Sequence, residues 1–132
     1  MLSGRSDGVR AMAGARVAVG TALVVAPGLV LRPWVGAEAS RRPVPRLLAR
    51  AMGGRDLAIG LGGLLAASHG APVRGWIEAG MVCDVGDALA TALAARHLPR
   101  AGAVAGILAA LGTAAAGRRI VAALEGDPAP GT

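Results

Sequence analysis

The chain has 132 residues, which is enough for one domain but short for two. Hydrophobic residues make up 54% of it and charged residues 17%, less than the roughly 25% of a typical soluble domain. The net charge is +6, but the arginines stand between apolar segments instead of forming a basic face, which argues against nucleic-acid binding. The single cysteine, Cys83, excludes an intramolecular disulfide and a CxxC site, and we expect it to be a packing residue.

Four apolar segments follow one another along the chain, at residues 9–31, 44–68, 73–96 and 99–124. Each has about 20 or more residues, the length that a helix needs to cross the hydrocarbon core of a bilayer. Pro and Gly separate the segments, and none of them alternates polar and apolar residues with a period of two. The sequence therefore predicts an all-α integral membrane four-helix bundle, a single domain over residues 1–132 with a disordered tail at 125–132.

Two alternatives stay open for these segments. A soluble, alanine-rich four-helix bundle would need a charged face on every helix, and residues 17–31 and 101–117 carry no charge at all. In the second alternative, the first segment is a signal peptide that is cleaved near Ala39, although its apolar stretch is long for a signal peptide.

The residues that flank the segments indicate a location in a membrane. Trp34 follows the first segment and Trp76 opens the third, so we expect each to anchor one membrane interface. Seven arginines border the loops after the first and third segments, against five on the side of the termini. This excess places the two loops in the cytoplasm of a multi-pass protein of the cell's inner membrane.

Charged residues interrupt the second and third segments at one depth. When residues are counted outward from the turn near Pro72, Asp56 is level with Asp87, and the same count places Arg16 level with Asp84. The sequence therefore predicts a buried ionic cluster, spread over about 11 Å or two helical turns, of Arg16, Arg55, Asp56, Asp84 and Asp87.

Small residues lie on the faces that carry these charges. We expect Gly53, Gly60 and Gly63 on the second segment and Gly80 on the third to allow close helix packing. Each unpaired charge in a membrane costs about 2.5–3.5 kcal/mol, so the charges must pair. Two arginines face three aspartates, which leaves one negative charge over, and we expect one of Asp84 and Asp87 to hold a proton at neutral pH.

No catalytic or cofactor signature accompanies the cluster. The stretch GLGG at residues 60–63 lies inside a segment and lacks the lysine of a phosphate-binding loop. His69 and His97 lie in loops on opposite sides, and the spacing of Asp84 and Asp87 offers a metal ion too few ligands. We therefore expect no catalytic residues, no metal and no cofactor, and a protein that is not an enzyme.

The stretch GGRDLAIGLGGLL at residues 53–65, followed by DVGDALA at 84–90, resembles a group of small bacterial four-span membrane proteins of unknown function. That group is loosely similar to the DoxX-like membrane proteins. Its second helix carries a G-x-R-D-x-x-x-G-L element and its third an acidic one, matched here by Gly53, Arg55, Asp56, Gly60 and Leu61, and by Asp84 and Asp87. The resemblance covers residues 16–95 and implies the fold and the location, but no activity.

Three functions are compatible with these features. The first is a structural or accessory membrane protein, whose partners are the bilayer and either a second copy of the chain or another membrane protein. The GxxxG match from Gly102 to Gly106 is a candidate contact for such a partner, although packing within the chain would use it equally well. The alternatives are a small proton-coupled transporter that uses Asp84 and Asp87, and a membrane redox subunit.

Overall fold

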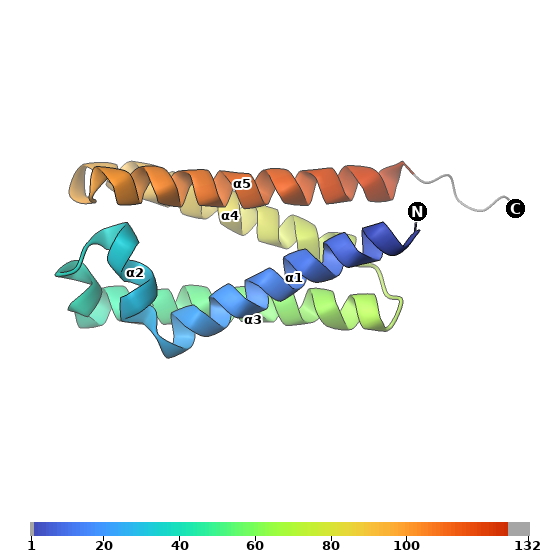
Figure 1. Ribbon diagram of the computed structural model, residues 1–132, viewed down its shortest axis with the longest axis horizontal. Coiled ribbons are helices and arrows are strands. Elements are labelled where there is room, and N and C mark those ends of the chain that lie inside the picture. The colour runs from blue at the N-terminus through green and yellow to red at the C-terminus, as the bar shows by residue number, and fades with distance from the viewer. Residues whose placement is uncertain (1, 127–132) are drawn as a thin grey trace, which may run out of the picture.

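The computed structural model describes residues 2–126, and within that range the chain is helical and contains no strand (Figure 1). The all-α expectation is thereby confirmed. A 3₁₀ turn, η1 (Ala39–Arg41), precedes α3, and a second, η2 (Ala95–His97), precedes α5. The predicted disordered tail lies outside the described residues except for Glu125 and Gly126. The helices are α1 (Leu2–Val25), α2 (Pro27–Val35), α3 (Pro43–Ser68), α4 (Arg74–Ala94) and α5 (Arg100–Glu125).

A proline divides the first apolar segment into two helices. Pro27 has no N–H, and its ring keeps the preceding Ala26 out of the helical conformation (φ −128°, ψ 54°). α1 therefore ends at Val25, and the chain turns back before α2 begins. As a result α2 lies at one end of the molecule, between the end of α1 and the start of α5 (Figure 1).

The four long helices form two pairs, in which α1 packs along α3 and α4 packs along α5 (Figure 1). Glycines bring the first pair together: a Cβ atom on Gly53 would lie 2.7 Å from the carbonyl oxygen of Gly20, and one on Gly60 would lie 2.8 Å from that of Ala13. Gly63 is less crowded, because its nearest neighbour would be the Ala13 side chain at 3.4 Å. Gly53 and Gly60 thus allow the backbones of α1 and α3 to touch.

The two pairs meet through apolar contacts near both ends of the bundle. At one end, Val9, Ile77 and Val121 form a buried cluster that joins α1, α4 and α5. At the other end, α2 packs on α1 and α3 through Leu31, and its Trp34 lies on α5. Most buried apolar residues between these ends are alanines, and no large side chain in the described range is fully buried. The middle of the bundle therefore depends on other contacts.

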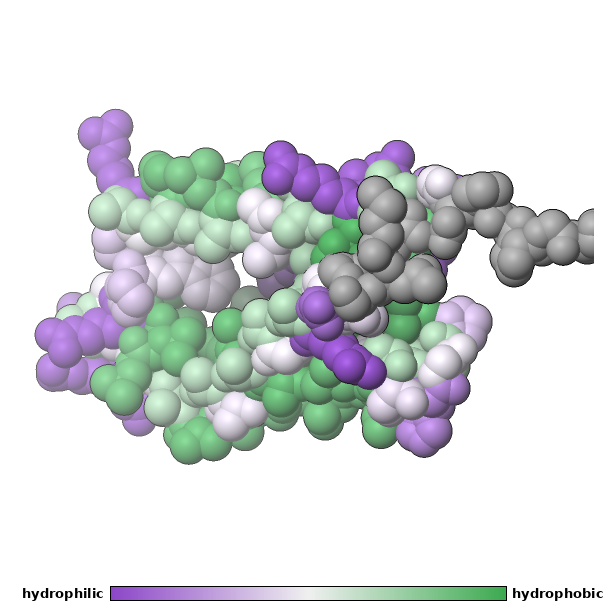
Figure 2. Space-filling view, turned by 45° about the vertical axis from the view of Figure 1, so that its right-hand side comes forward, coloured by the Kyte–Doolittle hydropathy of each residue, from purple (hydrophilic) through white to green (hydrophobic). Residues whose placement is uncertain are grey.

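Large apolar side chains lie mainly on the outside of the molecule. Leu93 is 76% exposed and Val82 73% exposed, and similar residues lie along one face of α3, α4 and α5. Figure 2 shows hydrophobic residues over the exposed sides of the helices, with hydrophilic residues mostly toward the two ends. Two helical stretches, Ser6–Val25 and Arg100–Glu125, are long and apolar enough to cross a membrane, which by itself is weak evidence of a membrane location.

Candidate functional site: an ionic cluster beside a cavity

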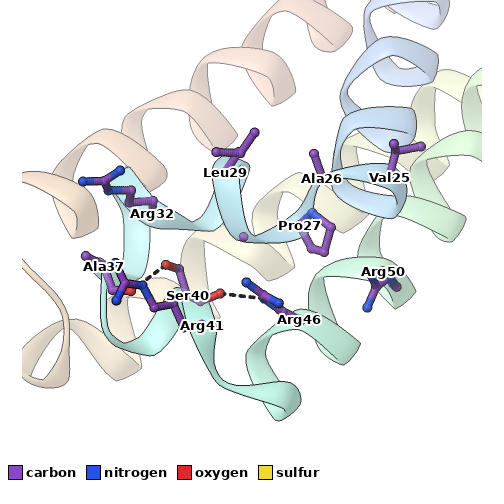
Figure 3. Close-up of a pocket in the computed structure, with 11 residues that line it drawn as sticks. Val25, Ala26, Pro27, Leu29, Arg32, Ala37, Ser40, Arg41, Arg46 and Arg50 are labelled. Atoms are coloured by element: carbon purple, nitrogen blue, oxygen red, sulfur yellow. Dashed lines mark hydrogen bonds between the residues drawn. The ribbon is translucent and has the colours of Figure 1, made fainter.

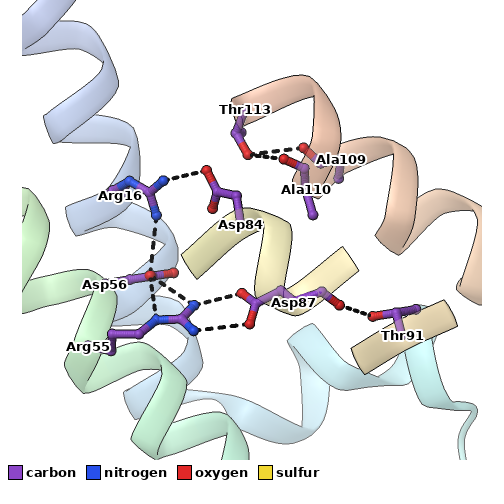
Figure 4. Close-up of polar contacts among 9 residues, drawn as sticks. All are labelled: Arg16, Arg55, Asp56, Asp84, Asp87, Thr91, Ala109, Ala110 and Thr113. Atoms are coloured by element: carbon purple, nitrogen blue, oxygen red, sulfur yellow. Dashed lines mark hydrogen bonds and ion pairs between the residues drawn. The ribbon is translucent and has the colours of Figure 1, made fainter. Parts of the chain in front are cut away.

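The structure brings Arg16, Arg55, Asp56, Asp84 and Asp87 together from α1, α3 and α4 (Figure 4). Arg16 reaches from α1 to both other helices. Its Nη2 donates to Asp84 Oδ2 at 2.5 Å, and its Nη1 donates to Asp56 Oδ1 at 3.4 Å. One guanidinium thus links α1 to α3 and α4.

Arg55 makes the second link from α3 to α4. It donates from Nη1 and Nη2 to the two carboxylate oxygens of Asp87, at 3.0 and 2.7 Å. Such a two-pronged pair fixes the relative orientation of its partners, because the planar guanidinium matches the carboxylate. Arg55 also donates to Oδ1 of its neighbour Asp56 from Nε at 3.3 Å and from Nη2 at 3.2 Å.

The two pairs differ in their access to solvent. The side chains of Arg16 and Asp84 are 12% and 10% exposed, whereas those of Arg55 and Asp87 are 29% and 24% exposed. Charges that are removed from solvent this far require partners, so the Arg16–Asp84 pair should be the costlier one to break.

The hydrogen bonds divide the two arginines unequally among the three aspartates, and the expected proton on Asp84 or Asp87 stays a prediction. Asp84 and Asp87 each have a close arginine partner, but Asp56 shares both arginines through a single oxygen. Asp56 is therefore the carboxylate without an arginine of its own. The sequence count could not show this, because it gave the depth of each residue and not the direction of its side chain.

Gly80 makes space for the cluster. A Cβ atom at this position would lie 2.6 Å from Arg16 Nη2 and 2.7 Å from Arg16 Nε, so the guanidinium lies directly on the backbone of α4. The sequence indicated Gly80 as a contact between helices. In the structure the group that packs on it is the arginine side chain that pairs with Asp84.

A cavity of about 370 Å³ lies beside the cluster, between the two helix pairs, and Figure 2 shows a gap between the layers formed by α1 and α5. Arg16, Asp56, Asp84 and Asp87 form the charged part of its wall. The remaining lining is mostly apolar, from residues including Met12, Val19, Leu23, Val30 and Ala109. A small molecule in this cavity would meet apolar surface and the ionic cluster together.

The two tryptophans contact glycines of neighbouring helices. Trp34 is half-buried against Gly102 and Gly106, so α2 covers the GxxxG face of α5 within the chain. Its Nε1 is buried at the cavity and has no hydrogen-bond partner within the described residues. Trp76 is 41% exposed, and its ring lies on Gly62 of α3.

Comparisons with protein-family models, with curated proteins and with solved structures found no match. The resemblance to the four-span bacterial group therefore stays a prediction.

Proposed function

We propose that the chain is a multi-pass protein of the bacterial inner membrane, in which α1, α3, α4 and α5 cross the bilayer and the ionic cluster holds the two helix pairs together. The observation that carries this proposal is the distribution of side chains. Many large apolar residues face outward, while most of the buried residues are glycines, alanines and paired aspartates. This arrangement suits a lipid environment, where helices associate through small residues and polar contacts.

Among the described residues, α1 and α5 contain stretches apolar enough to cross a membrane, and α3 and α4 are less apolar. These helices carry Arg55, Asp56, Asp84 and Asp87, which lower their mean hydropathy. In the structure each of the four makes an ion pair, Arg55 with Asp56 and Asp87, and Asp84 with Arg16 of α1. The outward face of α4 is apolar instead, with Val82, Val85, Leu89 and Leu93 exposed. Lipid would therefore contact apolar side chains along the whole helix.

The cluster has the features of a structural device. Its bonds join α1 and α3 to α4 at the level where alanine and glycine provide little apolar contact. Buried ion pairs specify a particular packing in some proteins, because every alternative arrangement leaves charges unpaired. We accordingly propose a non-enzymatic, accessory role, in which the cluster fixes the helix arrangement that a membrane partner would recognise.

An arginine on the outward face of α4 tests the membrane location. Val82 lies in the middle of α4 and is 73% exposed. An arginine there should cost about 2.5–3.5 kcal/mol in a bilayer and close to nothing in water. Val82→Arg should therefore lower the amount of chain that resists alkaline washing of membranes. Val44→Arg is the matched control, because Val44 is 65% exposed but lies at the first turn of α3. Release of the unaltered protein by alkaline washing would refute the proposal.

The cavity supports a second candidate, a proton-coupled carrier. Asp84 and Asp87 reach the cavity wall, and intramembrane carboxylates frequently mark proton pathways. Proteoliposomes that contain the unaltered protein should then conduct protons. The Asp84→Asn and Asp87→Asn variants should fold to similar yield and lose the flux. Absence of flux in the unaltered protein would eliminate the carrier, while loss of folded yield in both variants would favour the structural role.

A further inference from the structure

A second pocket, of about 330 Å³, lies at the end of the bundle where α1 turns into α2 and the chain returns through η1 to α3 (Figure 3). Four arginines line it, and its lining residues include no Asp or Glu. Glu38 is close in the sequence but pairs with Arg42 at 2.6 Å, and neither residue lines the pocket. The arginines are Arg32, Arg41, Arg46 and Arg50.

Backbone carbonyl groups hold two of these arginines in place. Arg46 Nε donates to the carbonyl oxygen of Ser40 at 3.0 Å, and Arg50 Nε donates to that of Val24 at 3.2 Å. Both bonds use Nε, so the terminal amino groups of these two guanidiniums have no hydrogen bond within the described residues. Four positive charges around one pocket repel one another unless an anion lies between them.

The backbone around the pocket favours the same kind of ligand. Gly28 leaves room for Arg46, since a Cβ atom there would lie 2.9 Å from Arg46 Nη2. Pro27 and Gly28 form the first turn of α2, which has no side-chain cap, and both line the pocket. The N-terminal end of a helix carries a partial positive charge, which adds to the charge of the arginines. An oxyanion therefore fits the site better than a neutral or cationic group.

Exposed apolar side chains border the arginines. Val25 and Leu29 line the pocket and are 75% and 74% exposed. We propose that the pocket binds the phosphate group of an anionic phospholipid, with the acyl chains against Val25 and Leu29. This inference rests on the proposed membrane location. Guanidinium groups bind phosphate oxygens in pairs, and anionic lipids are concentrated at the cytoplasmic face, where the arginine excess places this end of the chain.

Lipid binding to the purified full-length protein tests the proposal. Native mass spectrometry in a neutral detergent would compare phosphatidylglycerol with phosphatidylcholine of the same chain length. We expect the anionic lipid to bind at least about tenfold more tightly, because several arginines each contribute about a factor of five. Equal binding of the two lipids by the unaltered protein would overturn the proposal without any variant.

Two variants and one control locate the site. Arg46→Gln should weaken phosphatidylglycerol binding about fivefold. Gly28→Val should weaken it at unchanged net charge, because the new side chain takes the space of the Arg46 guanidinium. Arg119→Gln removes an exposed arginine of α5 outside the pocket and should leave binding unaltered. An equal loss in Arg46→Gln and Arg119→Gln would mean attraction by net charge alone and would overturn the site.

The phosphate group in the pocket could belong to a lipid or to free inorganic phosphate, and a competition experiment distinguishes the two. Millimolar phosphate should not displace the lipid, because it lacks acyl chains. Displacement would support oxyanion binding but overturn the assignment to a lipid. A protein that resists alkaline washing yet shows no preference for anionic lipid would disprove only the pocket assignment, whereas release by washing would disprove the membrane location itself.

Discussion

Replacement of Arg16 by methionine should destabilise the protein far more than replacement of Asp84 by asparagine. The cluster holds two arginines and three aspartates, a net charge of −1. Arg16→Met changes this to −2 and leaves Asp84 buried without its 2.5 Å partner. Asp84→Asn changes it to zero and keeps an oxygen that accepts from Arg16. The two substitutions remove the same ion pair but shift the charge of the cluster in opposite directions.

The magnitudes follow from the burial and the distances. At about 4 Å and an effective dielectric constant of about 20, one charge pair is worth about 4 kcal/mol. Removal of one partner from a buried pair typically costs about 3–5 kcal/mol, which is the expected loss for Arg16→Met. For Asp84→Asn the lost attraction is offset by weaker repulsion between the carboxylates, so a cost of about 1–2 kcal/mol is expected.

Unfolding in mixed micelles with increasing sodium dodecyl sulfate, followed by circular dichroism, would measure both losses. Arg42→Met is the control, because Arg42 pairs with Glu38 at the surface, where the two side chains are 67% and 86% exposed. Its cost should stay below about 1 kcal/mol. Equal losses for Arg16→Met and Asp84→Asn would refute the charge count, and a loss for Arg16→Met as small as that for Arg42→Met would refute the structural role of the cluster.

Three further predictions concern packing and the start of the chain. Gly80→Ala should displace the Arg16 guanidinium and cost about 1–3 kcal/mol in the same unfolding assay. Gly86→Ala is the control and should be neutral or stabilising, because a Cβ atom there meets open space. Equal effects of the two substitutions would disprove the contact of the guanidinium with the backbone of α4. Gly53→Ala should destabilise the α1–α3 contact while Gly54→Ala does not, and a harmless Gly53→Ala would contradict the close approach of these backbones. The mass of the purified protein should be that of a chain that still contains α1, because signal cleavage near Ala39 would remove Arg16 from the cluster. A mass that lacks the first 39 or so residues would contradict our account of the cluster.

The bounds of the later helices could be predicted closely from the sequence. The segments expected at 44–68, 73–96 and 99–124 correspond to α3, α4 and α5 within two residues at each end, because Pro and Gly mark the turns between them. The first segment was expected as one helix over 9–31. Its break at Pro27 has a local cause in the sequence, but the apolar composition continues through it and conceals the turn.

The meeting of the five charged residues could be anticipated because antiparallel neighbours bring residues at equal distances from a turn to equal depth. The pairing within the cluster could not, since it depends on which way each side chain leaves its helix. The cavity and the arginine pocket could not be predicted from the sequence either. Both depend on the return of α2 across the end of the bundle, which brings Trp34 to α5 and Gly28 to Arg46.

The division into helix pairs has a consequence for biogenesis. Within the cluster, α1 and α3 together carry Arg16, Arg55 and Asp56, a charge of +1, while α4 carries Asp84 and Asp87, a charge of −2. During synthesis the first pair emerges from the ribosome before its counter-charges exist. Each half alone would thus be an unbalanced hairpin exposed to quality-control proteases. Two halves cut within the loop between α3 and α4 and produced together should rescue each other, as complementary fragments of one protein.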